Sequence, residues 1–139
     1  MSNALQTFLQ YLTLAEYIEM FGSLWDQENK IIMKFNMWPS QRSMCDNIEE
    51  WHKDGFIETI HPKARQGGFS EMFAERGVKH ILQYPKSEGL IFSKRSEDSE
   101  YFLEKRMKAK IERLPKIAGI VWPKIVKANK ELIILSNGS

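Results

Sequence analysis

Residues 39–55 place the tightest constraint on the fold, because they combine a helix start, a helix face and a helix stop. Pro39 ends any preceding element and biases the residue before it away from helical backbone angles. Ser40 has the side chain of a good helix N-cap, and Gly55 ends the run. Between them, three apolar residues recur at i, i+4 and i+7: Met44, Ile48 and Trp51. The pattern predicts an amphipathic helix with one buried face.

Strand-like and turn-like segments follow this helix. Residues 56–60, FIETI, are rich in β-branched side chains and favour a strand. Residues 61–77 read as a long connection with turn residues at Pro62 and Gly67–Gly68, and FSEMFAE within it could hold one helical turn. Residues 78–84, VKHILQY, alternate and predict a second strand that Pro85 closes.

The N-terminal residues favour helix. Residues 4–21 carry apolar residues at helical spacing, and Thr13 with Glu16 forms a possible capping box, so this stretch is one helix or two. Gly22 is a suitable stop, and residues 23–30 read as a loop. Residues 31–38 fit either a strand or a short buried helix.

Residues 97–114 carry the strongest helical pattern, with Ser96 as the expected N-cap and acidic residues in the first turn. An apolar stripe of Leu103, Met107, Ile111 and Leu114 lies opposite many basic side chains. After it, Pro123 could begin another helix, whereas residues 131–135 could equally form a strand. Residues 89–94, GLIFSK, are a further candidate strand.

The segments PSQRSMCDNIEEWHKDGFIETI, HPKARQGG and VKHILQYP, taken in order, resemble a winged-helix DNA-binding domain. The resemblance covers about 45 residues. It implies an α+β fold whose recognition helix precedes two wing strands around a basic loop. Family members often add a long C-terminal helix that pairs with its twin, and residues 97–114 are similar to that helix. We therefore expect one domain over residues 1–139, with a winged-helix core at 1–95 and a C-terminal helical extension at 96–139.

The residue types of the predicted recognition helix suit DNA. Arg pairs with guanine and Gln or Asn with adenine in the major groove, and a helix N-terminus favours phosphate. Basic residues of the glycine-rich loop could meet the backbone. The expected DNA-binding residues are Ser40, Gln41, Arg42, Ser43, Asn47, Lys63, Arg65 and Arg76. Asp46, Glu49 and Glu50 argue against this interpretation, because they would repel phosphates.

Charge is divided unevenly along the chain. The net charge is +2, yet residues 1–60 hold four basic and nine acidic residues, whereas residues 101–130 hold nine and two. This asymmetry indicates an anionic partner or a solvated helix face. Leu103, Met107, Ile111 and Leu114 are the expected dimer interface, although sequence alone leaves open whether the stripe is buried within one chain or between two.

No motif of phosphate-loop, dinucleotide-binding or zinc-protease type is present, and the single cysteine, Cys45, falls on the predicted buried face. We expect no enzyme activity, no cofactor and no metal. No apolar run is long enough to span a bilayer, so we expect a cytoplasmic protein.

The function predicted first is a homodimeric, sequence-specific double-stranded DNA-binding protein, either a transcription regulator or a plasmid or phage replication or partition factor. The alternative is a protein-binding inhibitor or adaptor, also phage- or plasmid-encoded, on an α+β fold. Its four tryptophans and seven methionines suit an interface.

Overall fold

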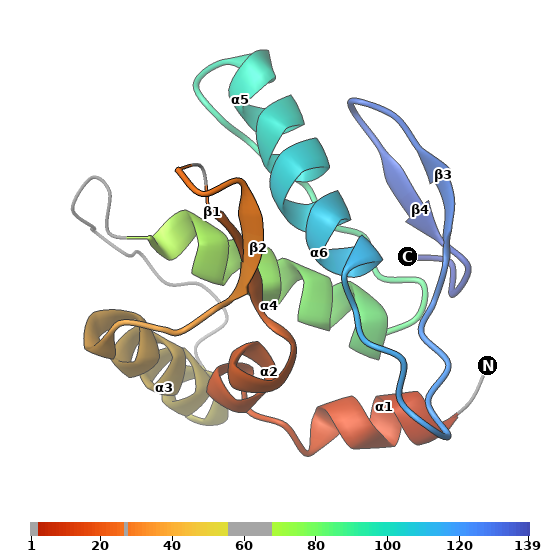
Figure 1. The fold of residues 1–139 in the computed structure, drawn as a ribbon. Coiled ribbons are helices and arrows are strands. Elements are labelled where there is room, and N and C mark those ends of the chain that lie inside the picture. The colour runs from red at the N-terminus through yellow and green to blue at the C-terminus, as the bar shows by residue number, and fades with distance from the viewer. Residues whose placement is uncertain (1–2, 27, 56–67) are drawn as a thin grey trace.

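The computed structural model describes residues 3–26, 28–55 and 68–139, and it confirms an α+β fold (Figure 1). Helices and two antiparallel hairpins surround one central helix, α4. The elements in chain order are α1 Asn3–Gln10, α2 Leu14–Phe21, β1 Ser23–Asp26, β2 Ile31–Lys34, α3 Pro39–Lys53, α4 Phe69–Gln83, α5 Ser96–Tyr101, the π-helix η1 Phe102–Lys108, α6 Ala109–Glu112, β3 Ile125–Ala128 and β4 Ile133–Leu135.

The first helical stretch is two helices, which a capping box separates as one of the two sequence alternatives predicted. The Thr13 side chain accepts from the backbone N–H of Glu16, and the Glu16 carboxylate accepts from the N–H of Thr13. These bonds satisfy amide groups that the first turn of α2 cannot pair internally. The expected stop at Gly22 is also confirmed.

A hairpin follows at once, where the sequence predicted a loop over residues 23–30. Strands β1 and β2 pair antiparallel, with Trp25 opposite Ile32 and Leu24 opposite Met33. Of the two alternatives for residues 31–38, strand is therefore correct for residues 31–34.

Helix α3 confirms the predicted amphipathic helix, but it begins earlier. Pro39 occupies the first turn, where its missing N–H costs nothing, and Trp38 rather than Ser40 is the N-cap. The Gln41 side chain accepts from the Trp38 N–H at 2.8 Å, which secures this start.

Helix α4 overturns the predicted second strand. Residues 78–84 alternate over too short a stretch to separate strand from helix. Residues 78–83 form the second half of a 15-residue helix, and Tyr84 is its C-cap. The single helical turn expected near residues 69–75 is the first half of the same helix. Gly68, with φ of 69°, precedes it in the left-handed region that favours glycine. The other expected wing strand, 56–60, lies outside the described residues, so a winged helix is not confirmed.

Residues 96–112 are helical throughout as α5, η1 and α6, in place of the single helix expected over 97–114, and the N-cap is Arg95 rather than Ser96. A long C-terminal helix is not seen, because the chain continues into the β3–β4 hairpin. The prediction of a helix that begins at Pro123 is therefore wrong. The alternative prediction, a strand within residues 131–135, is correct for residues 133–135. Residues 89–94 form no strand.

Hydrophobic side chains from both hairpin regions and all the helical regions except α5 meet in one buried cluster. In Figure 1, α4 crosses the middle of the molecule, with the helical run 96–112 above it and α1 to α3 below. The fully buried hydrophobic side chains of α4 are Met72, Ala74, Val78 and Leu82. Among the described helices, none is both long and apolar enough to cross a bilayer.

Candidate interaction surfaces

The predicted DNA-reading residues of α3 divide into exposed and engaged side chains. Ser40, Ser43 and Asn47 are exposed. Gln41 is buried, with its amide oxygen bound at the helix start. Arg42 is exposed, but it forms an ion pair with Glu19 of α2. The side chains expected to give the strongest base contacts are thus occupied within the chain.

The acidic residues of α3 have different roles. The Glu49 carboxylate accepts from the backbone N–H of Leu14 at 2.9 Å, which links α3 to the first turn of α2. A carboxylate at a helix N-terminus is favourable, so Glu49 has a structural purpose. Asp46 and Glu50 remain exposed on α3 and would meet any phosphate that approached it.

Of the remaining predicted DNA contacts, Arg76 alone lies within the described part of the chain. Lys63 and Arg65 lie outside the described residues. Arg76 is on α4, where its guanidinium lies 2.8 Å from the His52 ring nitrogen.

The stripe expected to form a dimer interface packs within the chain. Met107 and Ile111 are 9% and 7% exposed and belong to the central core. Leu103 and Leu114 are partly buried against the same core. These side chains therefore cover α4 and its neighbours.

Cys45 is fully buried, as predicted, and burial raises the pKa of its thiol to about 12, with a smaller contribution from Asp46 and Glu49. Because the thiolate is the reactive form, we expect iodoacetamide at pH 8 to modify the native protein at least about 100-fold more slowly than the unfolded protein. Mass spectrometry over time measures this directly, since the chain has one cysteine. Equal rates in native buffer and in guanidinium would contradict it.

Protonation of His80 is expected to lower the stability of the fold at acid pH. Burial, together with Arg76 and Lys79, lowers its pKa below the ordinary 6.5. As pH falls, the unfolded chain therefore takes up the proton before the folded chain does. The stability that the neutral His80 side chain contributes to the fold is present above pH 6.5 and is lost as pH falls through the folded-state pKa. We expect His80→Gln to flatten the loss of stability below pH 6.5 in urea titrations. An unchanged slope would contradict this assignment.

A buried polar cluster joins β1, α4 and α6 around the Lys110 ammonium. Lys110 is 3% exposed, and its Nζ lies 2.8 Å from Glu71 Oε2, 3.1 Å from Glu75 Oε1 and 2.6 Å from the Ser23 carbonyl oxygen. Glu75, 1% exposed, also accepts from the Ser23 N–H at 3.1 Å. Burial raises the pKa of Glu75, and Lys110 opposes that rise. The cluster thus holds the hairpin base against two helices.

The outer part of the same hairpin exposes large apolar side chains. Trp25 and Ile32, which are directly opposite each other, are 47% and 55% exposed. Ile31 and Met33 are exposed on the other face of β2. Asp26, Glu28, Lys30 and Lys34 balance in charge, so this surface, the β1–β2 patch, is apolar and neutral overall.

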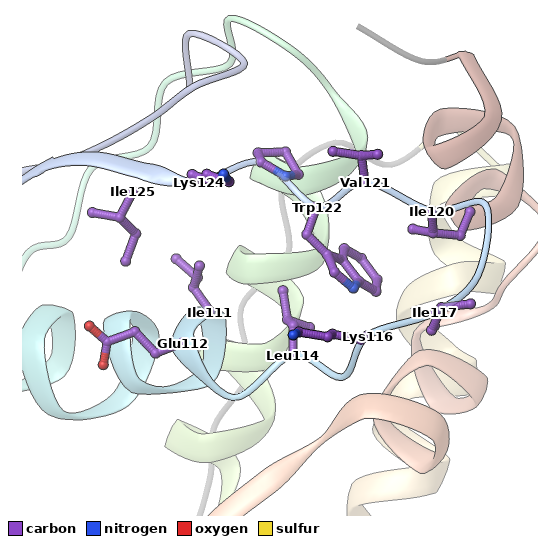
Figure 2. Close-up of a pocket in the computed structure, with 11 residues that line it drawn as sticks. Ile111, Glu112, Leu114, Lys116, Ile117, Ile120, Val121, Trp122, Lys124 and Ile125 are labelled. Carbon is purple, nitrogen blue, oxygen red and sulfur yellow. The ribbon is translucent and has the colours of Figure 1, made fainter.

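A second surface is an open groove between the end of α6 and the start of β3. Its volume is about 600 Å³. Figure 2 shows Ile111 and Ile125 on facing sides, with the Trp122 ring lying between Leu114 and Ile120. The complete lining is Ile111, Glu112, Leu114, Lys116, Ile117, Ile120, Val121, Trp122, Pro123, Lys124 and Ile125.

Trp122 is fixed in this groove from two sides. Its indole N–H donates to the Pro115 carbonyl oxygen at 2.7 Å, and its ring meets Phe21 edge-on at 5.4 Å between centroids. The groove floor is therefore preformed and has its polar indole atom already satisfied.

Comparison with protein-family models, with curated proteins and with solved structures finds no match to this chain. The interpretation of function thus depends on the surfaces themselves. Sequence reasoning missed both the β1–β2 patch and the groove. The patch had a local signal, the IIM run beside Trp25, whereas the groove joins segments whose proximity no local pattern gives.

Proposed function

We propose that this protein is a protein-binding module, an inhibitor or adaptor, that contacts its partner through the β1–β2 patch. The observation that carries the proposal is the directly paired Trp25 and Ile32, each about half exposed. Exposed apolar surface of this kind marks interaction sites, and tryptophan is enriched in interfaces.

The position of the patch supports the same proposal. A two-stranded ribbon is marginal by itself, yet this one is held at its base by Lys110 and Glu75. A rigid base with an apolar outer part lowers the ordering cost of binding. Because the patch is neutral, it suits an apolar surface of a partner protein and not a phosphate backbone.

Duplex DNA binding through α3 is the second candidate, and the exposed Ser40, Ser43 and Asn47 favour it. Against it stand the Arg42–Glu19 ion pair and the burial of Gln41. In Figure 1, α3 and the β3–β4 hairpin, which carries several lysines, lie on opposite sides of the molecule. The lysines of that hairpin therefore do not extend the α3 face.

Affinity capture from lysate of the cells that encode the protein tests the proposal, with quantitative mass spectrometry as the readout. We expect the wild-type chain to enrich a specific protein, and Trp25→Thr with Ile32→Thr to lose it while circular dichroism is unchanged. The matched control is Leu90→Thr with Phe92→Thr, which removes two side chains that are 82% and 86% exposed elsewhere.

A salt titration with a random DNA duplex, run in parallel, separates the two candidates. Phosphate contacts would make affinity fall steeply with salt. Tight, salt-dependent duplex binding without any enriched protein would overturn the proposed function.

A further inference from the structure

The groove between α6 and β3 has apolar walls and a basic rim. Lys116 and Lys124 belong to its lining and are exposed, and two further lysines, Lys127 and Lys130, lie along the β3–β4 hairpin beside a single acid, Glu131. Within the described part of the chain, none of these four ammonium groups has a carboxylate within 4 Å. The rim therefore carries positive charge that its own fold does not neutralise.

The one acidic residue of the lining does not change this balance. Glu112 lies 3.8 Å from Lys108 on the preceding turn of the helix. Figure 2 draws its carboxylate at the α6 end of the groove, away from Trp122. In Figure 2, Lys124 and Lys116 lie on opposite sides of the apolar centre, and Glu112, which is paired with Lys108, lies at one end.

The chemistry of the lining favours a peptide over a small metabolite. Small-molecule sites combine apolar walls with a few polar groups that converge on the ligand. Here the indole N–H of Trp122 is already donated to Pro115, and the lysines lie at the rim in water. An amphipathic helix that carries apolar anchors flanked by acidic side chains matches both the apolar walls of the groove and its basic rim.

We propose that the groove binds an acidic amphipathic helix of a partner protein. Its apolar residues at i, i+3, i+4 and i+7 would pack on Ile117, Ile120, Trp122 and Ile125, and its acids would meet Lys116 and Lys124. This inference rests on the proposed function, since it names a partner segment for a protein-binding module, but it uses a surface separate from the β1–β2 patch.

A designed helical peptide tests the groove directly. The probe carries leucine at i, i+3, i+4 and i+7 and glutamate elsewhere, with a fluorescein label for anisotropy. We expect micromolar affinity that weakens as salt is raised. The matched peptide with lysine for glutamate is expected to bind at least about tenfold more weakly, because its charges repel the rim.

Two variants locate the binding site. Lys116→Glu with Lys124→Glu is expected to weaken the acidic peptide at least about tenfold, whereas Lys53→Glu with Lys94→Glu, at two exposed lysines outside both surfaces, changes the net charge equally and is expected to leave affinity within about twofold. Isoleucine methyl NMR gives an independent readout. The expected shifts on peptide addition fall on Ile117, Ile120 and Ile125.

Equal binding of the lysine peptide, insensitivity to the Lys116 and Lys124 changes, or methyl shifts away from the groove would each overturn the inference. Its failure is distinguishable from failure of the proposed function. If the peptide does not bind but partner capture still depends on Trp25 and Ile32, the protein-binding role stands without the groove.

Discussion

Replacing Lys110 with methionine is expected to lower the free energy of unfolding by about 3–5 kcal/mol, the usual cost of leaving a buried charge without its partner. The ammonium lies between Glu71, Glu75 and the Ser23 carbonyl, and its side chain is 3% exposed. Methionine fills a similar volume but offers no donor, so the buried Glu75 carboxylate keeps only its bond from the Ser23 N–H and loses its counter-charge, and the Ser23 carbonyl oxygen loses its bond from Lys110. Urea unfolding at pH 7 measures the change.

Two controls separate charge from packing at this position. Lys108→Met removes a lysine paired with Glu112 at 3.8 Å and partly in solvent, and it should cost below about 1 kcal/mol. Adding Glu75→Gln to Lys110→Met should recover at least half of the loss, because the neutral amide can still accept from the Ser23 N–H. A loss under 1 kcal/mol for Lys110→Met alone would show that the cluster is not needed for stability.

Phe35→Ala is expected to cost about 3–5 kcal/mol. Phe35 is 2% exposed and directly follows β2, and its backbone N–H donates to the Gly22 carbonyl at 3.1 Å. Its ring also lies under Lys110, with Nζ 5.6 Å from the centroid. Truncation therefore opens a cavity and removes the aromatic face beside the buried ammonium.

Substitution of Phe35 by leucine tests whether the cavity or the loss of the aromatic face accounts for most of the destabilisation. Phe35→Leu keeps most of the apolar volume and should cost under about 1.5 kcal/mol. Phe92→Ala, at a side chain 86% exposed, should change unfolding by no more than about 0.5 kcal/mol. Thermal denaturation of the three variants gives the order, and equal losses for Phe35→Ala and Phe92→Ala would contradict the burial argument.

Local signals predicted α3 well because its stop, its apolar stripe and its starting proline all lie within 17 residues. The same is true of α2, where Thr13 and Glu16 form a capping box across three positions. Helix N-caps were less well placed. Ser40 and Ser96 both lie inside their helices, since a proline or an acidic first turn can begin a helix one residue earlier.

Helix α4 could not be predicted because its buried stripe contains a charge. Met72, Val78 and Leu82 lie on the buried side, but Glu75 stands between them and hides the apolar pattern. Burial of Glu75 depends on Lys110, which belongs to another element. Gly77 adds to the misreading, since glycine weakens a helix, yet it leaves room for the Met107 side chain to pack close to α4.

The candidate site was predicted least well, for a related reason. Residue types on α3 suggested base contacts, but whether a side chain is free depends on its neighbours in space. Arg42 forms an ion pair with Glu19, and the Gln41 side chain accepts a hydrogen bond from the Trp38 N–H at the start of α3. Such pairings between separate segments have no local sequence pattern.

The bond between Lys110 and the Ser23 carbonyl joins residues 87 positions apart. A ribosome adding about 5–20 residues per second would need roughly 4–17 s to bring Lys110 out after Ser23. During that interval residues 23–34 lack their buried anchor, and because a two-stranded ribbon is marginal by itself, the hairpin is not yet held in place. Synthesis of this protein should therefore leave the β1–β2 hairpin unanchored for seconds, and slower translation should lengthen that interval.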